Sequence, residues 1–242
     1  MREILRKTSA VLGIMASLAL PTPKTEAQVK DPWEAEVKIE TTNLLKLSRK
    51  LEKYTEYPRI EFLADTTPIG AYTQMCERAV RAMENFCEGF IGQPKFYQNL
   101  DENLFNRLIQ INSYVNKAIV YKTDKEKHGV EDFWEYKIVT TGDCDEFTLN
   151  KYILLTDKTS EISFRPNSFS LLFVNALNNQ NKPEGHLVLV FHAFINGRQV
   201  DLLLDNFKDS VHIVSESKHE FVSGTSPRGT WTSIKLNLAK EY

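Results

Sequence analysis

The dipeptide Asn196-Gly197 constrains the fold of this chain more than any other feature of its sequence. Between two apolar runs, Asn-Gly is the strongest local signal for a two-residue hairpin loop, because both loop residues must adopt positive φ. With this loop Ile195 pairs with Arg198, and every pair farther from the loop is fixed in turn. The sequence therefore predicts two antiparallel strands, 186–194 and 199–204, in a single register.

That register places two histidine–carboxylate pairs on one face of the hairpin. His192 lies directly opposite Asp201, and His186 is a diagonal neighbour of Asp205. Since facing and diagonal neighbours are both within reach of long side chains, either pair can form a contact. His186 follows Gly185 at the strand entrance, where another element can approach closely, whereas His192 is nearer the hairpin tip, where we expect solvation. Geometry favours His186 and leaves His192 open as the alternative.

Three segments ahead of the hairpin have patterns typical of helices. Apolar side chains in residues 101–120 recur at steps of three and four, the stripe of an amphipathic helix packed on a core. The stripe consists of Leu104, Leu108, Ile111, Val115 and Ile119. Residues 71–91 also look helical, and Thr140 to Asp143 form a capping sequence before a helical run from Cys144 to Leu155.

Strand-like segments rich in Val, Leu and Phe come after these helices. The first is 168–174, the hairpin strands follow, and 211–238 adds one or two more around Pro227-Arg228-Gly229. Because helices precede strands along the chain, the sequence predicts an α+β domain with an antiparallel sheet.

Cys144 is the residue whose position points to chemistry. It stands where the sequence predicts the start of a helix, and there the free backbone N–H groups and the helix dipole stabilise a thiolate. The same N–H groups can face a developing oxyanion. Asp143, Asp145 and Glu146 crowd the position and oppose thiolate formation, so a histidine cation or a metal ion should offset them. Alternatively, these acids are ordinary helix-start residues favoured by the dipole.

The charge of the chain argues against two classes of function. The formal net charge is −2, and the basic residues are scattered rather than gathered into a patch. A nucleic-acid partner is therefore not expected, because nothing supplies the positive field that phosphates need. No group of residues has the spacing of a zinc site.

The N-terminus has the order of an export signal. A basic start is followed by an uncharged apolar run, a helix break and small residues at a cleavage position: Arg2, Arg6, Lys7, then 10–20, Pro21, Pro23 and Thr25-Glu26-Ala27. The apolar run is short of the roughly 20 residues that span a bilayer. We therefore expect a signal peptide at 1–27, an extension at 28–70 and one domain at 71–242. A buried N-terminal helix is the alternative.

Three cysteines follow the expected cleavage site: Cys76, Cys87 and Cys144. In an oxidising compartment a pair tends to form a disulfide, which makes Cys76–Cys87 the natural pair and leaves Cys144 free. One continuous helix would hold Cys76 and Cys87 about 16 Å apart, so a bridge requires a break between them. Three buried cysteines acting as small hydrophobes are the alternative.

Several blocks of sequence occur around these residues in a fixed order. They are Ile111-Asn112-Ser113-Tyr114-Val115-Asn116, Tyr121, Asp124, Gly129-Val130-Glu131-Asp132-Phe133-Trp134, Gly142-Asp143-Cys144-Asp145-Glu146-Phe147-Thr148, Lys151-Tyr152, Gly185-His186-Leu187-Val188-Leu189 and Leu204-Asp205-Asn206. Together they resemble the bacterial transglutaminase-like cysteine peptidases, an exported or periplasmic group. The chain departs from the family pattern in three ways. The acids after the cysteine are swapped, Thr148 replaces an alanine, and the paired N-terminal cysteines are more widely spaced.

The resemblance implies a papain-like core in which a catalytic helix packs on the antiparallel sheet. Cys144 would be the nucleophile, His186 the base and Asp205 the orienter, with His186 and Asp205 on the sheet face turned toward the helix. The Cys144 N–H would supply part of an oxyanion hole, and Asn116 or Trp134 are candidates for its second donor. Asp143 and Asp145, which flank the cysteine, would hold calcium.

The resemblance also carries expectations about function. It implies hydrolysis of peptide bonds in a protein substrate through a thioester acyl-enzyme. Relatives cleave large surface adhesins in the periplasm under a membrane-bound cyclic-di-GMP receptor, so an adhesin substrate, such a receptor and a periplasmic or secreted location are expected. A transglutaminase or deamidase acting on protein glutamines, and a non-catalytic binding module of the same fold, are the alternatives.

Overall fold

The computed structural model describes residues 44–62, 95–130, 133–135, 137–177, 182–225, 231–237 and 240–241. The expected signal peptide, the expected helix at 71–91 and the Cys76–Cys87 pair lie outside these residues. None of the helices in the described ranges is long and apolar enough to cross a membrane.

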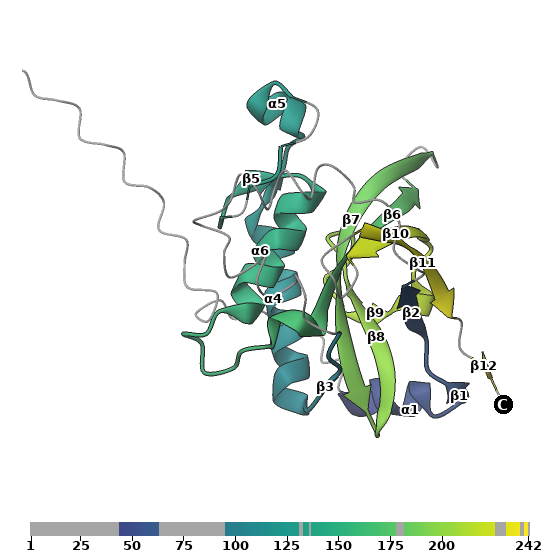
Figure 1. Ribbon diagram of the computed structural model, residues 1–242. Helices are drawn as coiled ribbons and strands as arrows, with labels where there is room; N and C mark the ends of the chain where they lie inside the picture. The colour runs from purple at the N-terminus through teal and green to yellow at the C-terminus, as the bar shows by residue number, and fades with distance from the viewer. Residues whose placement is uncertain are drawn as a thin grey trace, which may run out of the picture.

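A large sheet occupies one side of the molecule and two long helices the other (Figure 1). Its strands run in the order β2, β11, β10, β6, β7, β8, β9, with every neighbour antiparallel, and a short β3 pairs parallel to β7. The bounds are β2 Arg59–Phe62, β3 Gln98–Asn99, β6 Phe169–Leu177, β7 Pro183–Ile195, β8 Arg198–Leu204, β9 His212–Ile213, β10 Glu220–Thr225 and β11 Trp231–Asn237. The predicted α+β architecture is confirmed.

The helices and minor strands complete the described part of the chain. The helices are α1 Leu44–Leu51, α4 Glu102–Ala118, α5 Asp124–His128 and α6 Cys144–Thr156. The strands β1 Tyr54–Glu56 and β12 Lys240–Glu241 form one pair, and β4 Val120–Tyr121 and β5 Thr141–Gly142 form another. The amphipathic stripe and the capping sequence therefore predicted α4 and α6 to within two residues at each end.

The hairpin register predicted from Asn196-Gly197 is confirmed. Ile195 pairs with Arg198, and His192 pairs with Asp201. Asn196 and Gly197 have φ of 52° and 74°, the positive values that this loop requires.

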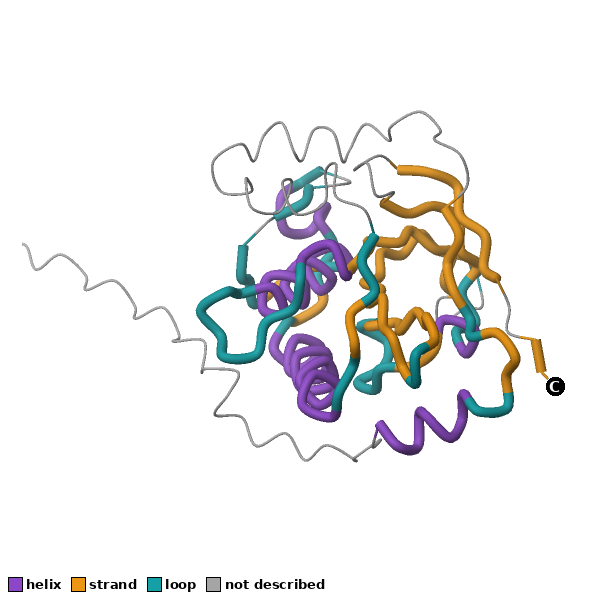
Figure 2. Tube along the Cα trace, turned by 60° about the horizontal axis from the view of Figure 1, so that its bottom comes forward, coloured by secondary structure: helices purple, strands orange, loops and turns teal. Residues whose placement is uncertain are grey.

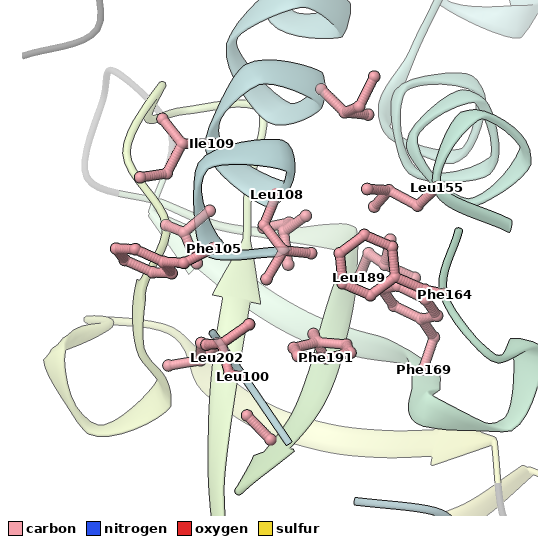
Figure 3. Close-up of a cluster of buried hydrophobic side chains, with 14 of the residues drawn as sticks. Leu100, Phe105, Leu108, Ile109, Leu155, Phe164, Phe169, Leu189, Phe191 and Leu202 are labelled. Atoms are coloured by element: carbon pink, nitrogen blue, oxygen red, sulfur yellow. The ribbon is translucent and has the colours of Figure 1, made fainter. Parts of the chain in front are cut away.

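The sheet carries a hydrophobic core on each face. The larger core lies between the sheet and helices α4 and α6, and Figure 3 shows part of it, with Phe105 and Leu108 of α4 near Leu189, Phe191 and Leu202 of the sheet. The second core lies on the opposite face and contains no residue of α4 or α6; it comprises Ile60, Leu172, Val174, Val188, Val190, Leu203, Val214 and Ile234. Figure 2 shows the long helices beside the strands of the sheet in a second view. Burial of each large apolar side chain contributes about 1.5–3 kcal/mol, so both cores fix the sheet firmly.

Candidate active site

The candidate nucleophile stands at the first residue of α6. Asp143 is the N-cap residue, and its backbone N–H donates to Glu146 Oε2 at 2.9 Å. Glu146 folds back over Gly142, where any Cβ would collide with its side chain. The predicted helix start at Cys144 is confirmed, and the glycine before it is required by a close approach rather than by backbone conformation.

The open edge of β7 fixes the position of Cys144. Strand β8 pairs with β7 only as far as Leu204 and Leu189, so the Leu187 backbone faces α6. Thr148 Oγ1 donates to the Leu187 carbonyl at 2.9 Å, and the Leu187 N–H donates to the Cys144 sulfur. Cys144 and Thr148 are one helical turn apart, on the same side of α6. The threonine that replaces the family's alanine thus anchors the helix to the strand.

His186 and Asp205 form the contact that the diagonal register predicted. His186 Nε2 donates to Asp205 Oδ1 at 2.9 Å, and both residues are buried. Burial alone would raise the pKa of Asp205, but hydrogen bonds from His186 and His219 hold it well below its usual range. An ionised carboxylate only accepts hydrogen bonds, so Nε2 of His186 carries its proton. That leaves Nδ1 of His186 free to act as a base.

The phenyl ring of Phe207 fixes the plane of the His186 imidazole. The two rings stack with centroids 4.4 Å apart and an interplanar angle of 4°. The Phe207 backbone N–H also donates to Asp205 Oδ1 at 3.1 Å. The residues after β8 therefore hold both the carboxylate and the imidazole.

Two asparagines of α4 tie the segment after β8 to the helix. Asn112 Nδ2 donates to the carbonyls of Lys208 and Asp209, and Asn116 Nδ2 donates to those of Asp205 and Lys208. The Asn116 amide is thus committed to backbone carbonyls, and it is not available as the second oxyanion donor considered above. Trp134, the other candidate, packs against the helix-side core.

Cys144 and His186 line one cleft of about 580 Å³. Its other lining residues are Tyr121, Ala176, Leu177, Glu184, Gly185, Asn206 and Phe207. Tyr121, Leu177 and Phe207 are each more than half exposed and give the cleft an apolar rim. Burial, Asp143 and Cys144 raise the pKa of Tyr121 to about 12, so its phenol stays protonated and can donate a hydrogen bond. The cleft offers room for peptide side chains beside the sulfur.

His186 and Asp205 do not lie on the sheet face turned toward the helices, and that expectation is wrong. His186 pairs across strands with Val174, which belongs to the second core, whereas its neighbour Leu187 belongs to the helix-side core. The physical reason is the alternation of side chains along β7: Leu187 and Leu189 face the helices, so His186 faces the second core. Because the edge of β7 is open there, the N-terminus of α6 meets the strand at its edge, so Cys144 and His186 share a cleft at the sheet margin.

A cluster of carboxylates surrounds the start of α6. Ligand atoms of Asp124, Asp143 and Glu146 lie within 4.8 Å of one another, and so do those of Asp143, Cys144 and Asp145. Among the described residues, no hydrogen-bond partner is found for buried oxygens of Asp143, Asp145 and Glu146. Lys127 approaches Glu146 Oε1 at 3.6 Å. Asp143 and Asp145 were anticipated from the sequence as metal ligands; Asp124 and Glu146 were not, although the resemblance included both.

These acids shape the electrostatics of the site. Burial, followed by the charges of Asp145 and Asp143, raises the pKa of the Cys144 thiol, against the N–H groups of Leu187 and of Cys144 itself. Burial and a hydrogen bond to Asp143 raise the pKa of Asp145, and burial raises that of Glu146 to about 7. The opposition to thiolate formation expected from the sequence therefore comes from Asp145 and Asp143.

The rival pair, His192 and Asp201, is a buried structural network. Both residues have no exposed surface, so the expected solvation near the hairpin tip is wrong. His192 Nδ1 lies 2.7 Å from Asp201 Oδ1, and its Nε2 lies 2.7 Å from Ser170 Oγ. The Ile60 N–H of β2 donates to Asp201 Oδ2 at 2.6 Å. Strand β2 covers this end of the face, and burial lowers the pKa of His192 to about 4, so it stays neutral.

Two further histidines, His212 and His219, are largely buried. His212 is buried in β9. His219 donates through Nε2 to Asp205 Oδ2 at 2.7 Å, with a side chain only 10% exposed. No local pattern marks His219, because it reaches Asp205 through a short 3-10 helix, Val214–Glu216, and a tertiary turn of the chain.

Comparisons with known proteins give one family and several solved structures. The sequence profile described as bacterial transglutaminase-like cysteine proteinase BTLCP matches residues 63–238. Calcium-bound Legionella pneumophila LapG is similar in structure, with 18% identity, a TM-score of 0.42, and coverage of 69% of this chain and 88% of that chain. EGTA-treated LapG of the same organism has 18% identity and a TM-score of 0.42, covering 82% and 90%. No curated protein matches the chain.

Proposed function

Because the chain belongs to the bacterial transglutaminase-like cysteine proteinases, we propose that it hydrolyses peptide bonds of a protein substrate with Cys144 as nucleophile. One observation carries the proposal. A cysteine at a helix N-terminus shares a cleft with a histidine whose Nε2 is held by a buried, ionised carboxylate. Nucleophile, base and orienter in this relation are the signature of covalent acyl transfer.

The mechanism follows from the hydrogen bonds of each residue. His186 takes the thiol proton through Nδ1, and the sulfur attacks the substrate carbonyl carbon. The oxyanion accepts a hydrogen bond from the Cys144 backbone N–H at the start of α6. When the C–N bond breaks, the amine leaves with the proton from His186, and a thioester forms. Water, deprotonated by His186, then releases the acid and restores the thiol.

A labelling experiment tests the assignment. A peptidyl acyloxymethyl ketone, which alkylates activated cysteine nucleophiles, should modify the full chain at Cys144, as read by peptide mass mapping. Incubation of a protein substrate with and without a primary amine then separates the activities, because hydrolysis yields free termini and transglutamination incorporates the amine. A chain that is not modified at Cys144 is a binding module of this fold rather than an enzyme.

The carboxylates at the start of α6 fit calcium. Calcium prefers several oxygen ligands, and the cluster offers buried carboxylate oxygens that have no hydrogen-bond partner among the described residues. We propose that Asp124, Asp143, Asp145 and Glu146 hold the ion. Bound there, calcium would supply positive charge that offsets the acids beside the thiol. Protein residues carry out every proton transfer of the proposed reaction.

Export and substrate complete the proposal. We propose that residues 1–27 are a signal peptide, 28–70 an extension and 71–242 the peptidase domain, so that the enzyme acts in the periplasm or outside the cell. A large surface adhesin is the proposed substrate and a membrane-bound receptor the proposed regulator, both on the resemblance alone. The mature protein should begin after Ala27 by mass spectrometry, and an intact Met1 on the functional protein would contradict export.

A further inference from the structure

The proposed mechanism assigns no role to one histidine near the site, His219. His219 lies in the turn before β10, and its Nε2 is 2.7 Å from Asp205 Oδ2. Its backbone N–H donates to Ser217 Oγ at 3.0 Å, which fixes the turn. The His219 side chain is largely buried and contacts the proposed orienter, Asp205. Its place in the site therefore indicates a role there.

Both oxygens of the Asp205 carboxylate accept hydrogen bonds. Oδ1 accepts from His186 Nε2 and from the Phe207 N–H, and Oδ2 accepts from His219. Because each oxygen is held by a donor in a different direction, the carboxylate cannot rotate about its Cβ–Cγ bond without breaking a charge-assisted hydrogen bond. The orientation of His186 is thereby fixed from behind.

The buried pair of His192 and Asp201 is also anchored through the second carboxylate oxygen, but by other groups. Asp201 holds His192 with Oδ1, and its Oδ2 accepts from the Ile60 N–H and from Lys95. A carboxylate that orients an imidazole is thus anchored through its second oxygen in both places. At Asp205 the anchor is the imidazole of His219, which belongs to a segment outside the hairpin and does not line the cleft.

We propose that His219 is a positioning residue of the active site, which fixes Asp205 and, through it, the His186 imidazole. The inference rests on the proposed function. Hydrogen bonds account for the grouping of His186, Asp205 and His219, so no metal ion is required there. The other titratable groups that sense the Asp205 charge are Lys151 of α6 and His212 of β9.

Inactivation kinetics of the full chain test the proposal. The acyloxymethyl ketone gives a limiting rate of Cys144 alkylation and a separate half-saturation concentration, which divide chemistry from binding. His219→Ala should lower the limiting rate by about 10- to 100-fold, the effect of losing a hydrogen bond to a charged group. The half-saturation concentration should stay within about two-fold, because His219 does not line the cleft.

Two variants and one spectrum make the test specific. His219→Gln should restore most of the limiting rate, since its amide can donate to Oδ2. His128→Gln, at an exposed histidine that does not line the cleft, should leave the rate unchanged. In ¹⁵N spectra of histidine-labelled protein, His219→Ala should reduce the Nε2-protonated tautomer of His186. An unchanged limiting rate and an unchanged tautomer in His219→Ala overturn the proposal about His219 but leave the proposed peptidase activity in place. Failure of His219→Gln to recover also overturns it, and a wild-type chain that resists alkylation overturns the proposed function itself.

Discussion

Replacement of Cys144 with alanine should abolish hydrolysis while the fold persists. Loss of the nucleophile of a catalytic triad typically lowers kcat by about 10⁴- to 10⁶-fold, because acyl transfer to the enzyme is no longer available. The structure predicts little effect on stability, since Thr148 still anchors α6 to the Leu187 carbonyl. Turnover of a protein substrate and the thermal melting temperature measure the two effects.

A variant at the other end of the same helix provides the control. Thr156 Oγ1 donates to the Tyr152 carbonyl and does not line the cleft. Thr156→Ala should therefore retain wild-type turnover. If Cys144→Ala kept more than about one-hundredth of wild-type activity, a second nucleophile would be at work and the assignment of Cys144 would fail.

Local sequence signals were sufficient for the framework of the site. The Asn196-Gly197 loop fixes the register of β7 and β8 because only positive φ at both positions closes the turn, and the register alone brings His186 beside Asp205. The capping sequence likewise locates Cys144 at the first residue of α6. Each of these features depends on neighbours in the chain or directly across one turn.

Features that depend on distant packing were not predictable. Whether His192 is solvated depends on β2, which joins the sheet from more than a hundred residues earlier in the chain and covers Asp201. The register shows which side chains share a face with His186, but the face that α4 and α6 cover depends on their packing, which no local pattern predicts. His219 reaches Asp205 through a tertiary turn, so no periodicity marks it.

Removal of calcium should destabilise the protein and suppress Cys144 alkylation together. Several buried carboxylates lie at one helix start, and their mutual repulsion is unfavourable unless a cation or protons offset it. An ion at 100 times its dissociation constant stabilises the native state by about 2.7 kcal/mol, which corresponds to roughly 5–10 °C in melting temperature for a domain of this size. EGTA should lower the melting temperature by that amount, and calcium should restore it.

Matched variants separate a bound ion from simple charge. Asp124→Asn removes a proposed ligand and should abolish the calcium-dependent shift in melting temperature. Asp101→Asn removes an acid that caps α4 away from the cluster, and asparagine caps equally well, so the shift should persist. Magnesium should not substitute, because it requires a smaller octahedral site and retains its waters. If neither EGTA nor calcium moves the melting temperature of the wild-type chain, the acids are helix-start residues held by protons and by Lys127, and the calcium site is wrong.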